Sequence, residues 1–160
     1  MEITIIKNLS LAYISSFALK CAVDLDISGH IQAYSRAMPL NDLARSIPIP
    51  PEKDSMLGRL MALLVHQGIF VQSEAGYLLT PVSELLLIEG SNMGAYVHCL
   101  TQVNFITSYD RLSEVFKDAG TSTLFQKAFD GKQFWEFVKE RPNFGNTKLA
   151  QTIFIRILSL

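Results

Sequence analysis

Residues 39–80, PLNDLARSIPIPPEKDSMLGRLMALLVHQGIFVQSEAGYLLT, carry the most informative pattern of the chain. Apolar residues recur at helical spacing over 40–47 and again over 54–67, which predicts a short amphipathic helix followed by a longer one. The proline-rich segment 48–53 between them predicts a turn. Gly68 then ends the longer helix, because glycine readily adopts the left-handed conformation found after helix ends.

Two short strands are predicted next, at 69–72 and 76–80, on either side of a polar turn at 73–76 that contains a glycine. A further helix, over 9–25, precedes the whole stretch. Helix, short helix, turn, longer helix and hairpin is the element order of a winged helix, in which the hairpin is the wing. We therefore predict a mainly α fold, a winged-helix-like helical domain with one small β-hairpin.

The helix predicted over 9–25 is apolar nearly all round, since only Lys20 and Asp24 carry charge. A helix of this kind is buried on several sides, either inside a domain or between subunits. Beyond the hairpin, helical spacing continues over 81–88 and over 90–116, where we expect one or two helices. An aromatic-rich stretch follows at 124–138, and a last helix is predicted over 147–158.

The composition limits the function as well as the fold. The 160 residues are 49% hydrophobic and 18% charged, with a net charge of −1, which excludes intrinsic disorder and predicts one domain, or one and a fraction. Nucleic-acid binding would need a basic footprint that this balance lacks. The charged fraction lies below the roughly 25% of an average soluble protein, which indicates that a partner covers some of the surface.

Cysteine use and hydropathy favour a cytoplasmic protein. Cys21 and Cys99 are far apart and lack the dense spacing of a disulfide scaffold, so we expect free thiols in a reducing compartment. The amino end lacks the cleavage site of a signal peptide. The longest uncharged stretch, 90–109, is too polar to cross a membrane.

The sequence offers no complete active site. It has no glycine-rich loop of the phosphate-binding type, and His30, His66 and His98 have no cysteine or carboxylate at metal-ligand spacing. His98 and Cys99 are adjacent, but neighbouring residues on a helix point about 100° apart, which disfavours a nucleophile and base pair. We therefore predict no catalytic, cofactor-binding or metal-binding residue in this chain.

A winged helix also raises DNA binding as an alternative function. The would-be recognition helix, 54–67, presents only Arg59 and His66 to base edges or phosphates, with Lys53 just before it. The wing carries Glu74, whose charge repels phosphate. Charge therefore disfavours this alternative.

A resemblance to a known family is carried by four motifs, ALKCAVDLDI at 18–27, PLNDLARSIPIPPEK at 39–53, RLMALLVHQGIF at 59–70 and YLLTPVSELLL at 77–87. Together they resemble the amino-terminal domain of plant small-molecule O-methyltransferases of the caffeic acid, flavonoid and alkaloid type, which depend on S-adenosylmethionine. The resemblance continues through LFQKAFDGKQFWEF at 124–137 and RPNF at 141–144.

This resemblance implies a two-domain subunit of which the chain holds the first part, a winged-helix-like dimerisation domain over 1–145. A divergent helical tail over 146–160 then ends the chain before the Rossmann-like domain that binds S-adenosylmethionine and supplies a histidine base. No cofactor is then expected on this chain, and it is expected to be inactive alone. Two departures from the family are Pro39, where a hydroxyl residue is usual, and Lys148, where an apolar pocket residue is expected.

The resemblance also assigns two sets of residues. The first helix is expected to supply the dimer interface, through Leu11, Ile14, Phe17, Ala18, Cys21, Ala22 and Leu25. The wall of a pocket for a small aromatic acceptor is expected at Leu100, Asn104, Phe134, Val138 and Phe144, although aromatic residues at helical spacing are equally typical of a core. The implied partner is a second copy, or a full-length O-methyltransferase with which this chain acts in trans.

Overall fold

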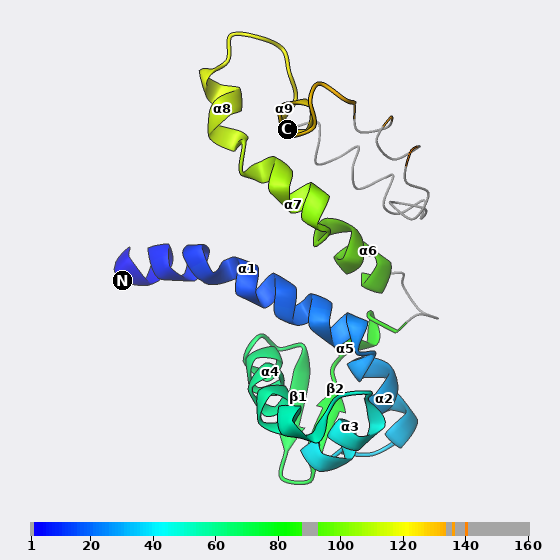
Figure 1. Ribbon diagram of the computed structural model, residues 1–160. Helices are drawn as coiled ribbons and strands as arrows, with labels where there is room; N and C mark the ends of the chain where they lie inside the picture. The colour runs from blue at the N-terminus through cyan, green and yellow to red at the C-terminus, as the bar shows by residue number, and fades with distance from the viewer. Residues whose placement is uncertain (1, 88–92, 134–135, 137–139, 141–160) are drawn as a thin grey trace. The chain divides into compact units, whose positions relative to one another are not determined.

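The computed structural model of the chain describes residues 2–87, 93–133, 136 and 140 (Figure 1). The chain divides into two compact units, residues 1–97 and residues 98–160. The helix predicted over 147–158, and Phe134 and Trp135 of the aromatic-rich stretch, lie outside the described residues.

Helices dominate the described residues of both units, and one antiparallel hairpin lies in the first, which confirms the predicted mainly α fold. The first unit contains α1 (Glu2–Asp24), α2 (Ile27–Tyr34), α3 (Leu40–Ser46), the 3-10 turn η1 (Pro51–Lys53), α4 (Asp54–His66), β1 (Phe70–Ser73), β2 (Gly76–Leu79) and α5 (Pro81–Glu84). Helix α6 (Met93–Leu100) spans the boundary, and the second unit contains α7 (Val103–Tyr109), α8 (Leu112–Lys117) and α9 (Leu124–Ala128).

Two helices differ from the prediction near the amino end. Helix α1 begins at Glu2 rather than at residue 9, because the preceding residues contain no helix breaker. Helix α2 was not expected, since Ser28 and Gly29 are poor helix formers. It forms because Ile27 and Ile31, one turn apart, are both buried. Its first turn is capped by Asp26, whose carboxylate accepts a hydrogen bond from the Gly29 N–H at 3.2 Å.

The prediction of one or two helices over 90–116 was wrong in number, because α6, α7 and α8 divide the described part of this segment into three. Gln102 adopts an extended conformation between α6 and α7, with φ of −66° and ψ of 137°. Neither proline nor glycine marks this break in the sequence, so periodicity alone did not reveal it.

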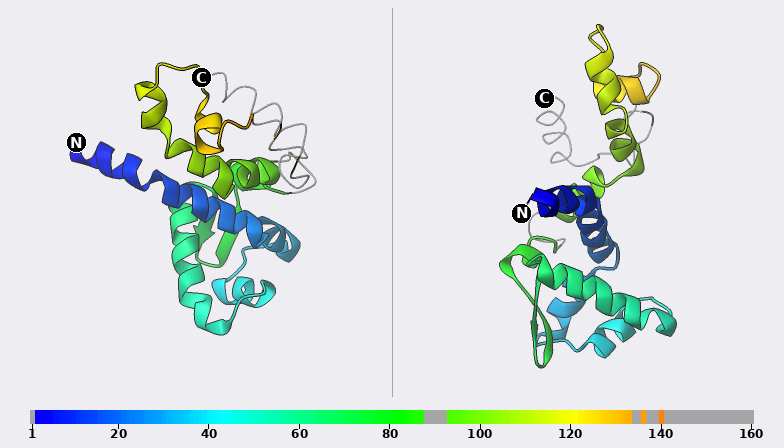
Figure 2. Two further views of the ribbon diagram at one scale, coloured as in Figure 1. Left: turned by 45° about the horizontal axis from the view of Figure 1, so that its top comes forward. Right: turned by 90° about the vertical axis from the view of Figure 1, so that its left-hand side faces the viewer.

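The core of the first unit lies between α2, α3, α4 and the hairpin, with the carboxyl-terminal half of α1 against it (Figures 1 and 2). Helix α4 buries Leu57, Met61 and Leu64 on one face, at the spacing of successive helical turns. The buried core consists of Ala18, Ala22, Ile27, Ile31, Met38, Leu43, Ala44, Ile47, Leu57, Met61, Leu64, Phe70 and Tyr77.

The hairpin is extended by one bridge to the segment before α3. Strand β1 pairs antiparallel with β2, with Phe70 opposite Leu79. The Met38 N–H donates to the Tyr77 carbonyl and the Tyr77 N–H donates back to the Met38 carbonyl, both at 2.9 Å. Gly76 lies beside this bridge with φ of 138°, and a Cβ there would come within 2.4 Å of the Met38 carbonyl. Only glycine therefore fits at this turn.

Thr80 fastens the end of the hairpin to the start of α5 and to the segment after α4. Its hydroxyl donates to the Ile69 carbonyl at 2.7 Å and accepts from the Ser83 N–H at 3.3 Å. The Ser83 hydroxyl accepts in turn from the Thr80 N–H at 2.8 Å, which completes a capping box for α5.

In the second unit, α7 and α9 contact one another around two buried aromatic residues, Phe105 and Phe125. Phe105 packs edge-on against Tyr109, with ring centroids 5.4 Å apart, and Phe125 packs against Phe129 at 4.4 Å. Among the described residues of both units, no helix has the length and apolar character needed to cross a membrane.

Candidate dimer interface

Helix α1 presents large apolar side chains to solvent along most of its length. No residue from 8 to 19 carries a charge, and every residue from 2 to 14 is exposed. The amino-terminal half of the helix projects beyond α4 and the hairpin (Figures 1 and 2). The exposed large apolar residues on it are Ile3, Ile5, Ile6, Leu9, Leu11, Tyr13, Ile14 and Phe17, with exposed fractions from 41% to 73%. A surface this apolar is typical of an interaction site.

The carboxyl-terminal half of α1 is held in place by its own unit. Ala18 and Ala22 are one turn apart and 8% and 2% exposed, so their small side chains let α1 lie close to the core. Leu25 packs against the same core from the end of the helix. The helix is therefore anchored at one end and uncovered at the other.

The seven residues predicted for the interface fall into three groups. Leu11, Ile14 and Phe17 are exposed, Cys21 and Leu25 are half-buried, and Ala18 and Ala22 belong to the core of their own chain. Five further exposed apolar residues were not assigned to the interface: Ile3, Ile5, Ile6, Leu9 and Tyr13. Leu9 and Tyr13 lie within the predicted helix, whereas the first three precede residue 9, where that helix was predicted to begin. The run ITII at 3–6 was the signal that would have extended it.

The two cysteines are free thiols, with Cys21 half-buried and Cys99 buried. Burial is the main cause that raises the pKa of Cys21; the charge of Asp24 adds to this and that of Lys20 opposes it. Burial raises the pKa of Cys99 to about 11. A thiol of this kind is neutral near pH 7 and a poor nucleophile, which argues against a reactive pair of His98 and Cys99.

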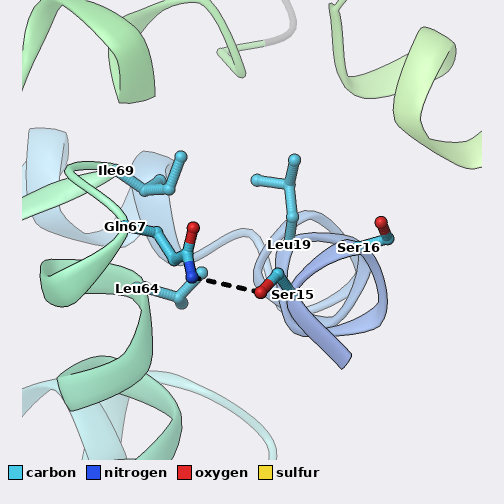
Figure 3. Close-up of a pocket in the computed structure, with 6 residues that line it drawn as sticks. All are labelled: Ser15, Ser16, Leu19, Leu64, Gln67 and Ile69. Carbon is cyan, nitrogen blue, oxygen red and sulfur yellow. Dashed lines mark hydrogen bonds between the residues drawn. The ribbon is translucent and has the colours of Figure 1, made fainter. Parts of the chain in front are cut away.

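A hollow lies beside α1, where the helix passes the end of α4 (Figure 3). Its volume is about 190 Å³, and its walls are Ser15, Ser16, Leu19, Leu64, Gln67 and Ile69. Figure 3 shows Leu19 and Ile69 on its two sides, with the Gln67 amide reaching toward α1. The Gln67 Nε2 donates to the Ser15 Oγ at 3.1 Å, so both polar groups at this point already have a partner.

The end of α4 shapes one wall of this hollow. Gly68, with φ of 75°, follows the helix, and its N–H donates to the Val65 carbonyl at 2.9 Å. The Ile69 N–H donates to the Leu64 carbonyl at 2.9 Å. This pair of bonds is the Schellman motif, which turns Ile69 back toward Leu64 and places both beside α1.

The predicted acceptor-pocket residues are only partly described. Leu100 ends α6 and Asn104 lies in the first turn of α7, and both are half-buried. Phe134, Val138 and Phe144 lie outside the described residues, so a pocket built from all five stays a prediction. Within the described ranges, no group of three or more histidine, cysteine or carboxylate residues is placed to hold a metal ion.

Comparison with known proteins gives the family. The model of the O-methyltransferase dimerisation domain matches residues 7–89, so this chain belongs to the O-methyltransferase dimerisation-domain family. The resemblance to plant O-methyltransferases is confirmed by myricetin O-methyltransferase of Catharanthus roseus, which is 35% identical over 149 residues. That alignment covers 90% of this chain and 42% of the relative.

Two solved structures share the fold. The pyocyanin biosynthetic protein PhzM has a TM-score of 0.75 and 24% identity, covering 93% of this chain and 43% of that one. CalO1, a methyltransferase in calicheamicin biosynthesis solved in an SAH-bound form, also has a TM-score of 0.75, with 14% identity over 97% of this chain and 44% of that one. The chain thus spans about two fifths of the length of the proteins it is similar to.

Proposed function

We propose that this chain pairs the subunits of an O-methyltransferase of the plant small-molecule type, as a homodimer formed through the exposed part of α1. One observation carries the proposal: a long helix without charge from residue 8 to 19, anchored at one end, exposes eight large apolar residues in a dimerisation-domain family. Charge depletion with apolar and aromatic enrichment is typical of the centre of an interface.

The exposed area of α1 is large enough for this role. Eight side chains with roughly 100 Å² each give about 800 Å² per subunit, which is the contribution of one partner to a stable interface of standard size. Because residues 2–14 of α1 are exposed all round the helix, more than one element of a partner must pack against them. A second copy of the chain offers its own α1 and other elements of its first unit for these contacts.

The function of the complete protein extends this proposal. By its resemblance, it transfers a methyl group from S-adenosylmethionine to a hydroxyl of a small aromatic acceptor in the cytoplasm. By the same resemblance, the donor site and the base belong to the Rossmann-like domain of the complete enzyme, so we propose that these 160 residues do not transfer a methyl group by themselves. Leu100 and Asn104 contribute walls to the acceptor pocket in that arrangement.

A dilution series tests the pairing. Size-exclusion chromatography with light scattering is expected to give twice the chain mass of 17.9 kDa down to low micromolar concentration. Ile14→Glu, which places a carboxylate in the apolar surface, is expected to raise the dimer Kd by at least about 100-fold. Ser55→Glu on the exposed first turn of α4 is the control and is expected to leave Kd unchanged. A parent chain that is monomeric at all concentrations would overturn the proposal.

The same surface also fits a full-length O-methyltransferase that carries the same kind of domain, with this chain acting in trans. Mixing the chain with such an enzyme separates the two arrangements. Heterodimers, detected by mass, together with a change in turnover of the enzyme, support action in trans. Homodimers that do not exchange support the first proposal.

A further inference from the structure

The hollow beside α1 lies on the same face of that helix as an exposed leucine. Ser15 and Leu19 line the hollow and are one turn apart. Leu11 lies one turn before Ser15 on this face, and it is 53% exposed. An uncovered apolar side chain and an uncovered apolar recess therefore follow one another along a single face of α1.

We propose that the hollow is the socket of the subunit interface and that it receives the Leu11 side chain of a second copy. This inference rests on the proposed dimer and specifies which contact holds it together. The hollow of about 190 Å³ is large enough, because an apolar cavity of about 150 Å³ admits a group the size of benzene.

The chemistry of the hollow suits an aliphatic occupant. Three of its walls, Leu19, Leu64 and Ile69, are apolar. The polar groups of Ser15 and Gln67 bond to each other, so an entering apolar group leaves that donor and acceptor satisfied. None of the described residues that line it is charged, which disfavours an acidic or basic partner segment.

A two-fold symmetric dimer can form the proposed contact of Leu11 with the hollow in both directions at the same time. In a two-fold dimer every contact occurs twice. If the two α1 helices cross antiparallel with the axis on the face that carries Leu11 and Ser15, midway between these two residues, the Leu11 of each copy faces the Ser15 region of the other. The four residues between Leu11 and Ser15 correspond to about 6 Å along the helix. Both leucines then enter both sockets at once, on either side of the axis.

Two substitutions at Gln67 test the socket on the full chain. Gln67 is exposed at the end of α4, so Gln67→Ala removes its hydrogen bond to Ser15 but leaves the hollow open. Gln67→Trp removes the same bond and fills the hollow. We expect Gln67→Ala to change the dimer Kd by less than about threefold and Gln67→Trp to raise it by about 100-fold, since two sockets are lost per dimer. Far-UV circular dichroism and a thermal melt check that both variants are folded.

Leu11→Ala identifies the occupant. It is expected to raise Kd by about 100-fold in the parent chain and by less than about threefold when Gln67→Trp is already present, because the socket is then filled. Equal Kd values for Gln67→Ala and Gln67→Trp would overturn the socket while leaving the proposed dimer intact. Full additivity of Leu11→Ala and Gln67→Trp would overturn Leu11 as the occupant. A parent chain that never dimerises would overturn the proposed function and the socket with it.

Discussion

Replacing Gly76 by alanine is expected to be one of the most destabilising small substitutions in the first unit. Gly76 has φ of 138°, and a Cβ would lie 2.4 Å from the Met38 carbonyl carbon and oxygen, both of which are backbone atoms. An ordinary contact at this point begins near 3.4 Å. The segment that carries Met38 must therefore move by about 1 Å, since no side-chain rotation relieves the contact.

The size of this movement determines how much Gly76→Ala is expected to lower the free energy of unfolding. The two hydrogen bonds between Met38 and Tyr77 are 2.9 Å long, and a shift of about 1 Å takes both beyond hydrogen-bond range. Their loss costs about 1–3 kcal/mol, at roughly 0.5–1.5 kcal/mol each. Alanine in this glycine conformation adds about 1–3 kcal/mol. The expected total of about 2–6 kcal/mol is a large part of the 5–15 kcal/mol that stabilises a typical domain.

Gly68→Ala is the matched control, because the chain offers a second glycine in the same unit at positive φ. Gly68 has φ of 75°, but among the described residues no heavy atom beyond its chain neighbours lies within 4 Å of the position of its Cβ. This variant therefore carries the conformational cost alone, about 1–2 kcal/mol. Urea unfolding followed by circular dichroism measures the free energy of unfolding of each variant. Both variants are measured at the same protein concentration, so that dimer formation contributes equally to the two values. If the two variants lose stability within about 1 kcal/mol of each other, the argument from the Met38 contact is refuted.

Three further predictions concern the core, a cap and a thiol. Met61→Ala at a fully buried position is expected to lower the free energy of unfolding by about 2–5 kcal/mol, measured in the same urea series. Thr80→Val removes the N-cap of α5 and the bond to Ile69 and is expected to cost about 1–2 kcal/mol, with Thr80→Ser retaining most of the stability. Burial raises the pKa of Cys99 from 9.0 to about 11, so the protonated thiol favours the folded state. The contribution of this thiol to the free energy of unfolding is fully present below pH 9 and is lost as pH rises from 9 toward 11. Cys99→Ser should therefore reduce the dependence of the free energy of unfolding on pH in this range. Labelling of Cys99 by iodoacetamide at pH 8 is expected to be much slower than in the unfolded chain, and equal rates would contradict its burial.

Local sequence patterns predicted the helices and strands correctly where the residues that form the pattern are also the ones that are buried. The apolar spacing over 54–67 predicted α4, because Leu57, Met61 and Leu64 lie on one face and that face is the one buried. The glycine in the turn after residue 73 predicted the hairpin, and its role is visible in the bridge to Met38. The low charge of the first helix predicted a covered surface, and the structure shows how much of that helix its own unit leaves exposed.

Patterns failed where tertiary contacts decide the local conformation. Helix α2 has weak intrinsic preference and forms because Ile27 and Ile31 are buried against other elements. The break at Gln102 between α6 and α7 carries no proline or glycine, so its cause is not local. The hollow beside α1 lies where Ser15 and Gln67, which are 52 positions apart in the sequence, form a hydrogen bond. The apolar periodicity of a single helix contains no information about contacts between residues so far apart.

A mostly helical fold with one hairpin, a first helix short of charge, and the motifs of O-methyltransferase dimerisation domains were all predictable from the order of the amino acids. These properties follow from side-chain spacing, composition and turn chemistry, which act over a few neighbouring residues. Three features emerged only from the packing of the helices: which part of α1 is exposed, that Ala18 and Ala22 belong to the core of their own chain, and that a hollow lies next to Ser15. Those features depend on how α1 and α4 pack, because a surface is defined by what the rest of the chain leaves uncovered.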